Sequence, residues 1–294
     1  MLGISLYKDK IFFLRTEKSK KEFSVTNYGS RSYKNFNQLI SNSAKDIIKN
    51  EKINNEDTIS YIIDSQFCSF NEIYCEDSNS LDFHNNLSGA SNMKAYLDSY
   101  YYPIGSRDDH FLGVHVEKGL KKKILSSVEK LNVSIRSIGV GIFSAEMLAR
   151  FVFKAHSLDN YLILRFITSG ALEVLYVDDG LLSVYARYSI VNKNLKPMKV
   201  IGSRKNEDKI RLNILKLLKG TTKIANIDKT FVYQTSGQSP IVKNIISKNP
   251  KNISLLNIFN HSDHRDEKAK GNIGSTMNEI RFSELGQLFG GLNV

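Results

Sequence analysis

The sequence predicts an α/β protein made of two lobes that repeat one plan. Three observations indicate this fold class. A chain of 294 residues is about two domains long. Extended apolar runs alternate with stretches of helical spacing. A pattern of three strands at the start of the chain returns after its middle. The composition, 41% hydrophobic and 24% charged, supports a buried core and excludes disorder, collagen and coiled coil.

The first half opens as a β meander and continues with alternating helices and strands. Short apolar runs between polar residues predict strands at 2–6, 11–14, 22–28, 58–64, 110–116 and 133–140. Apolar residues at helical spacing predict helices at 36–48, at about 93–100 and at 117–131. We expect Ser144 to cap a connector helix that buries Ala145, Leu148 and Phe151.

The second half repeats the meander, with strands expected at 161–166, 171–177 and 181–187. Asp178-Asp179-Gly180 joins the last two, and Asp-Gly between apolar runs is a strong hairpin signal. Further strands are expected at 230–234 and 254–256, and helices at about 210–218, 241–247 and 282–289. These elements place the first lobe at 1–157, with a small αβ subdomain inserted at about 77–140, and the second lobe at 158–294.

Positive charge is concentrated in one segment. The chain carries 41 basic and 30 acidic residues, a net charge of +11, and residues 193–223 hold ten basic residues against two acidic ones. The ordinary interpretation of such a segment is a solvated face. The alternative is docking to an anionic membrane surface or to an acidic protein. Nucleic acid is not expected as a partner, because no aromatic-plus-basic recognition signature accompanies the charge.

Several other functional classes lack support in the sequence. The longest apolar stretch, 161–177, is broken by charged and polar residues, so we expect no transmembrane helix. The first residues lack the pattern of an export signal, which predicts a cytoplasmic protein. Cys68 and Cys75 are interpreted as structural thiols. The histidines and aspartates of 261–266 are interpreted as a solvated loop, and no metal site is expected.

Five parts of the chain resemble PilM-type proteins of the actin-like ATPase superfamily in their order and spacing. They are residues 2–9, 111–145, 161–187, 231–239 and the closing segments 257–259 and 282–292. The resemblance implies an actin-like (ribonuclease H-like) duplicated fold of two lobes, with a small αβ subdomain inserted in the first lobe.

The nucleotide motifs that the resemblance implies are degenerate here. An actin-like enzyme holds ATP phosphates on backbone amides of glycine turns, and two carboxylates organise magnesium and the attacking water. Ser5 stands at the first acidic position and Tyr7 at a glycine, while Arg165 stands at the second acidic position and Ile167 at a glycine. The positions of the degenerate cleft are Ser5, Tyr7, Lys8, Arg165, Thr168, Ser169, Gly170, Ser236 and Gly237.

We therefore expect no catalytic residues, no cofactor and no metal, and interpret the chain as a pseudo-ATPase. Metal-free nucleotide binding, with Arg165 or Lys8 meeting a phosphate, stays open. The alternative for Arg165 is an ion pair with Glu173 or Asp178.

For function, the resemblance implies a scaffold in a type IV pilus or related secretion assembly, cytoplasmic and peripheral to the inner membrane. Its partner would be the cytoplasmic tail of a PilN-like membrane protein. The alternatives are a working ATP-binding ATPase or kinase of the same fold, or an adaptor in cell division or secretion.

Overall fold

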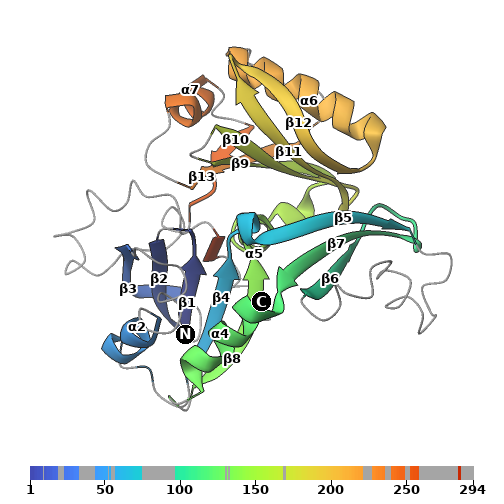
Figure 1. The fold of residues 1–294 in the computed structure, drawn as a ribbon. Coiled ribbons are helices and arrows are strands. Elements are labelled where there is room, and N and C mark those ends of the chain that lie inside the picture. The colour runs from blue at the N-terminus through green and yellow to red at the C-terminus, as the bar shows by residue number, and fades with distance from the viewer. Residues whose placement is uncertain are drawn as a thin grey trace. The chain divides into compact units, whose positions relative to one another are not determined.

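The structure is a computed structural model, and it divides the chain into two compact units (Figure 1). Unit 1 comprises residues 1–68, 118–153 and 256–294, and unit 2 comprises residues 69–117 and 154–255. Each unit is described by itself. The structure describes residues 1–8, 10–18, 23–32, 44–51, 53, 57–74, 97–129, 131, 133–167, 170–220, 227–235, 240–248, 252–257 and 284–285.

Unit 1 is built on a five-stranded sheet of order β3-β2-β1-β4-β8. Its strands are β1 (Leu2–Leu6), β2 (Lys10–Lys18), β3 (Phe23–Ser32), β4 (Thr58–Ile63) and β8 (Ser134–Val140). The pairs β1–β2 and β2–β3 are antiparallel, whereas β1–β4 and β4–β8 are parallel. Every residue of β1 is buried, which is why its sequence is a continuous apolar run rather than an alternating one.

The helices described in unit 1 are α2 (Ala44–Asn50), α4 (Lys118–Val128), α5 (Gly141–Phe151) and the short 3₁₀ turn η2 (Ser65–Phe67). The predicted cap of α5 is wrong. Helix α5 begins at Gly141, directly after β8, with Val140 in the cap position and no side-chain cap. Ser144 lies inside the helix and is buried, as are Ala145 and Leu148, whereas Phe151, which was expected on the buried side, is 41% exposed. Because β8 leads directly into α5, there is no loop between them in which a serine could act as the cap.

Unit 2 is built on a six-stranded sheet of order β12-β11-β10-β9-β13-β14. Its strands are β9 (Asn160–Ile167), β10 (Ala171–Asp178), β11 (Leu181–Val191), β12 (Asn194–Gly202), β13 (Lys229–Gln234) and β14 (Ile253–Leu255). The first three strands in sequence form an antiparallel meander, and the last two continue the sheet in parallel from β9. This is the strand order of unit 1 with β12 added at one edge, so the predicted duplication is confirmed.

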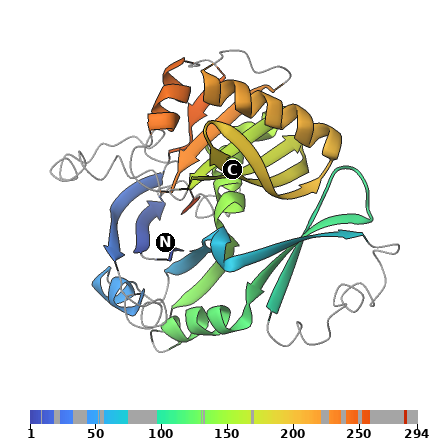
Figure 2. The same cartoon turned by 45° about the horizontal axis from the view of Figure 1, so that its top comes forward.

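Helices α6 (Arg204–Lys219) and α7 (Pro240–Lys248) cover one face of this sheet (Figure 2), and a 3₁₀ turn, η3 (Ala155–Ser157), precedes β9. The core between helices and sheet is apolar and contains Leu162, Val174, Ile214 and Val242. The Ser203 side chain caps α6, and Gly220 ends it in the left-handed conformation that glycine adopts without strain.

Unit 2 also holds a three-stranded sheet, β5-β7-β6, formed by β5 (Cys68–Tyr74), β7 (His110–Glu117) and β6 (Leu97–Pro103). The Gly202 amide of β12 donates to Glu72 Oε1 at 2.9 Å, and the Phe70 ring stacks on Tyr185 at 4.5 Å. These contacts tie the small sheet to the six-stranded one.

Three features differ from the prediction. The helix expected at about 93–100 is wrong where the structure describes it, because 97–103 forms strand β6, whose tyrosines favour a sheet. The αβ insert expected at 77–140 is divided, because β8 pairs with β4 in unit 1 and only β5, β6 and β7 form the small sheet. Residues 69–117 group with the second half of the chain and residues 256–294 with the first, unlike the predicted lobe boundaries.

Candidate functional site

One candidate site of unit 1 lies where three parallel strands end. Strands β1, β4 and β8 are in register at Leu6, Ile63 and Val140. The next residues, Tyr7, Asp64 and Gly141, therefore come to the same edge of the sheet. In open α/β sheets this carboxyl edge is the usual place for a ligand.

The carboxylate of Glu284 occupies part of this edge. The Tyr7 hydroxyl donates to Glu284 Oε2 at 2.6 Å, and both side chains are buried. A methyl group on the Gly141 α-carbon would lie 2.8 Å from the same oxygen, so only glycine lets the carboxylate pack against the first residue of α5. Acidic groups are stabilised at a helix N-terminus, where the first backbone amides have no intrahelical partner. This carboxylate therefore lies where an anion is favoured.

Asp64 is a second carboxylate at the edge. It is buried, and its Oδ1 accepts a hydrogen bond from the Gln66 amide at 3.2 Å. Its Oδ2 accepts from Gln66 Nε2 at 2.9 Å. Asp64 thus caps the 3₁₀ turn η2, and both of its oxygens have protein donors.

Two predicted cleft positions of unit 1 have different environments. Ser5 is fully buried within β1, and its hydroxyl has no hydrogen-bond partner among the described residues. Lys8 is exposed in the turn between β1 and β2, which the Tyr7 amide closes by donating to the Lys10 carbonyl at 3.0 Å. Neither Tyr7 nor Lys8 has a positive φ, so neither of these two residues adopts the left-handed conformation of a glycine turn.

The third predicted position, Arg165, forms a buried ion pair in unit 2. Its Nη1 lies 2.8 Å from Glu173 Oε2, and the exposed fraction of both side chains is 0%. The Tyr185 hydroxyl donates to the other oxygen of Glu173 at 2.5 Å. Burial raises the pKa of Tyr185 well above 10, and the neighbouring Glu173 carboxylate raises it further. Of the two alternatives for Arg165, the pair with Glu173 is therefore the one observed.

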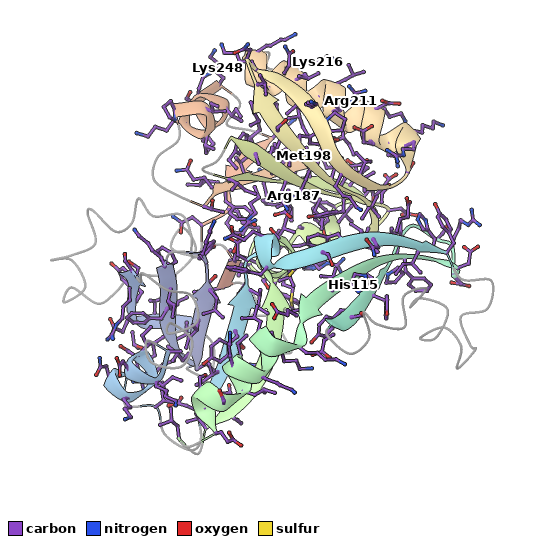
Figure 3. All side chains as sticks on the ribbon, in the orientation of Figure 1. His115, Arg187, Met198, Arg211, Lys216 and Lys248 are labelled. Atoms are coloured by element: carbon purple, nitrogen blue, oxygen red, sulfur yellow. The ribbon has the colours of Figure 1, made fainter. Side chains whose placement is uncertain are left out.

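These charges form a row across the sheet. Glu173 on β10 is paired in register with Arg165 on β9 and with Arg187 on β11. Arg187 lies on the face turned away from α6, because its neighbours in sequence pack into the core under that helix (Figure 3). Its Nε is buried without a hydrogen-bond partner among the described residues. One carboxylate thus lies between two guanidinium groups.

The second glycine turn is described only at its end. Gly170 has a φ of 76°, and its amide donates to the Ile167 carbonyl at 3.1 Å, so it keeps the left-handed conformation of a turn glycine. The predicted positions Thr168, Ser169, Ser236 and Gly237 lie outside the described residues, as do Cys75, the loop at 261–266 and most of the helix expected at 282–289.

In each unit, the carboxylates described near these positions already have protein donors. Asp64 is held by Gln66, Glu284 by Tyr7 and Glu173 by Arg165. A carboxylate that binds magnesium would have to exchange such partners for the ion. Within the described part of the chain, no three His, Cys, Asp or Glu side chains are grouped as a metal site. No helix described there is long and apolar enough to cross a membrane.

The sequence interpretation missed both carboxylates of unit 1. Asp64 had a local signal, since an acidic residue directly follows the apolar run of β4. Glu284 had none, because it meets Tyr7 across a separation of 277 residues.

The two sheets of matching strand order, with helices on them, define the actin-like ATPase fold. The fold is confirmed by solved structures. One is a chain of the PilM-PilN type IV pilus biogenesis complex, which is 8% identical in sequence, covers 98% of both chains and has a TM-score of 0.61. The predicted resemblance to PilM-type proteins is thereby confirmed at the level of the fold.

Two other solved structures are more distant. The cytoplasmic domain of EpsL, an inner membrane component of the type II secretion system of Vibrio cholerae, is 8% identical, with 84% of this chain and 93% of that chain covered and a TM-score of 0.43. A Bacteroides thetaiotaomicron protein with actin-like ATPase fold is 9% identical, with 89% and 91% covered and a TM-score of 0.44. No protein-family model and no curated protein sequence matches the chain.

Proposed function

We propose that this protein is a non-catalytic scaffold of the actin-like fold that binds the cytoplasmic tail of an inner-membrane protein in a type IV pilus or related secretion assembly. It would act in the cytoplasm, peripheral to the inner membrane. The observation that carries the proposal is the full-length likeness to a chain of the PilM-PilN complex, which spans 98% of both chains.

The side chains at the degenerate motifs support the non-catalytic half of the proposal. An actin-like ATPase needs carboxylates that are available to magnesium and water. At the corresponding positions Ser5 offers a buried hydroxyl, and the guanidinium of Arg165 is engaged by Glu173. A buried cation at the second acidic position would repel a magnesium ion rather than hold it.

The proposed partner, a membrane protein's cytoplasmic tail, can be recognised as an extended peptide. An extended tail binds through backbone hydrogen bonds, and pockets for alternate side chains add specificity. Such a tail would belong to a small membrane protein with one span, encoded close to this chain.

Calorimetric titration with Mg-ATP and a phosphate-release assay test the non-catalytic half. We expect no magnesium-dependent binding and no turnover. If nucleotide binds without metal, Lys8→Ala should weaken it and the matched change Lys49→Ala on α2 should not. The resemblance puts Lys8 at the first phosphate turn, and both lysines are exposed. Magnesium-dependent binding or turnover would contradict the proposal.

Fluorescence anisotropy tests the partner half. The labelled peptide is the cytoplasmic tail of the neighbouring one-span membrane protein, and a scrambled peptide of the same composition is the control. We expect saturable binding of the native tail only. Equal binding of both peptides, or binding of neither, would reject the partner.

One observation favours the alternative of a nucleotide-binding enzyme. Asp64 and Glu284 both lie in unit 1 near the carboxyl edge of the sheet, where open α/β sheets usually bind their ligands. The Mg-ATP titration decides between the alternatives. Under the scaffold proposal these two carboxylates are structural, one capping η2 and the other accepting from Tyr7.

A further inference from the structure

The outer side of α6 carries a narrow stripe of exposed side chains. We call it the α6 stripe, and its members are Lys205, Lys209, Leu212, Lys216 and Lys219. At 3.6 residues per turn these five positions fall within an arc of about 80° and extend along about 21 Å of helix. The opposite side of α6 packs on the core of unit 2 through Ile210, Ile214 and Leu217. The stripe therefore points directly away from the sheet.

The charge of the stripe is not balanced by the helix. Glu207 is buried and accepts from the Tyr188 hydroxyl at 2.7 Å, and Asp208 pairs with Arg211 at 2.8 Å. Arg211 also lies 3.2 Å from Glu207, so one guanidinium compensates both carboxylates. Within the described part of the chain, none of the four stripe lysines forms an ion pair. Lysines at i, i+4 and i, i+3 repel one another, so the stripe does not serve the stability of the helix.

Helix α7 extends the basic surface. Both helices pack on the same face of the six-stranded sheet, so their outer sides face the same way. Lys248, at the end of α7, lies beside Gly220, which ends α6. Figure 3 shows Lys216 and Lys248 on the outer side of this helix layer. Together the two helices carry eight basic and two acidic side chains, a net charge of +6.

The chemistry of the stripe fits a lipid surface better than an acidic protein. Specific recognition of a protein carboxylate favours the arginine fork, and the stripe contains no arginine. Arg204 and Arg211 of α6 fall outside its arc, and Arg211 is engaged by Asp208. Flexible lysines instead reach phosphates over a broad area and keep their charge in water. Leu212, which is 57% exposed, lies at the centre of the stripe and offers an apolar side chain to the interfacial region.

We propose that the α6 stripe docks on an anionic phospholipid membrane, with its lysines at headgroup phosphates and Leu212 entering the interface. The proposal does not rest on the tail-binding function above. A protein that failed to bind any tail would still bind vesicles, and one that failed to bind vesicles could still bind a tail.

Vesicle flotation of the full chain tests the charge contribution. The vesicles contain phosphatidylcholine alone or with about 30% phosphatidylglycerol. Each lysine near the anionic surface increases the partition coefficient by a factor of about five. We expect binding to the anionic vesicles only, with loss at high salt. Lys209→Glu/Lys216→Glu should weaken it by at least about 25-fold. The matched double change Lys45→Glu/Lys49→Glu, on α2 of unit 1, alters net charge equally and should bind nearly as wild type.

A single tryptophan tests the position of Leu212, because the chain contains none. Leu212→Trp should show a blue-shifted emission on anionic vesicles. Val191→Trp is the control, since Val191 is 54% exposed and lies on the sheet face opposite α6, as its neighbour Ile190 packs into the core. Its emission should not shift.

Three results would overturn the proposal. Equal losses for the two double variants would mean that net charge alone drives binding. Equal emission shifts for the two tryptophan variants would show that the membrane does not contact the α6 side of the sheet in preference to the opposite side. Binding to polyglutamate but not to anionic vesicles would identify an acidic protein as the partner. Thermal unfolding of each variant, followed by circular dichroism, shows whether it is folded.

Discussion

Removal of the Arg165 charge is the most informative perturbation of the sheet in unit 2. Arg165→Met keeps most of the side-chain volume and leaves the buried Glu173 with the Tyr185 hydroxyl as a donor and Arg187 as a neighbouring cation. Breaking a fully buried ion pair from one side costs about 3–5 kcal/mol. For a unit of this size that loss lowers the melting temperature by roughly 10 °C.

The double variant Arg165→Met/Glu173→Leu separates the charge from the packing. Replacing both partners by apolar groups removes the unpaired charge, so we expect a smaller loss than for either single change. The Tyr185 hydroxyl then lacks its acceptor at a cost of about 1–3 kcal/mol, which Tyr185→Phe in the triple variant should recover.

Urea unfolding followed by circular dichroism measures these free energies. The control is Arg107→Met, which removes an arginine from an ion pair with the exposed Asp109 in the same unit and should change the free energy of unfolding little. If Arg165→Met cost no more than this control, or if the two single losses simply added in the double variant, the argument that Glu173 engages Arg165 would be refuted.

Three further changes test the fold and the edge of unit 1. Gly202 has a φ of 102°, and a methyl group there would lie 2.2 Å from the Ser183 carbonyl oxygen, so Gly202→Ala should lower the free energy of unfolding by about 3 kcal/mol or more; a wild-type urea midpoint would contradict this. Tyr7→Phe should cost about 2 kcal/mol, because it removes a hydrogen bond to the buried carboxylate of Glu284; a loss below about 0.5 kcal/mol would show that the bond contributes little. Burial raises the pKa of Tyr61 from 10.0 to about 12. The stability due to its protonated phenol is fully present below pH 10 and is lost as the pH rises to 12, by up to roughly 3 kcal/mol. Tyr61→Phe should flatten the dependence of unfolding free energy on pH in that interval, and an unchanged slope would exclude this residue as the cause.

Most strands could be predicted because their signal is local. The runs that became β1, β4, β9 and β10 are buried along nearly their whole length, so each is a continuous apolar segment. The Asp-Gly turn after β10 can likewise be predicted from four consecutive residues, and Gly180 has the positive φ that this turn requires.

Other elements could not be predicted, since their conformation depends on distant partners. Residues 97–103 form a strand because β7 pairs with them, although their aromatic spacing also suits a helix. Strand β12 was missed within the basic segment because its exposed residues, including Met198, hide the pattern of an edge strand (Figure 3). The sequence predicts Ser144 as a cap because a serine before an apolar stripe is a common start signal, although the helix begins three residues earlier.

The candidate site divides in the same way. The residue types at the degenerate positions, Ser5, Tyr7 and Arg165, can be read from the sequence, and the prediction that no metal-bound triphosphate is held rests on them. The sequence alone does not show which carboxylate each of these side chains contacts. Arg165 had two candidates within reach along the chain, and the antiparallel register of β9 and β10 places Glu173 beside it.

The amino-acid sequence by itself determined the duplicated order of strands and helices, since burial imposes apolar patterns of fixed period on every element. Only the tertiary structure decided that Glu284 closes on Tyr7 and packs against Gly141, a meeting across 277 residues. Contacts between residues so far apart in the sequence depend on how the whole chain folds, and the local spacing of apolar residues carries no information about them.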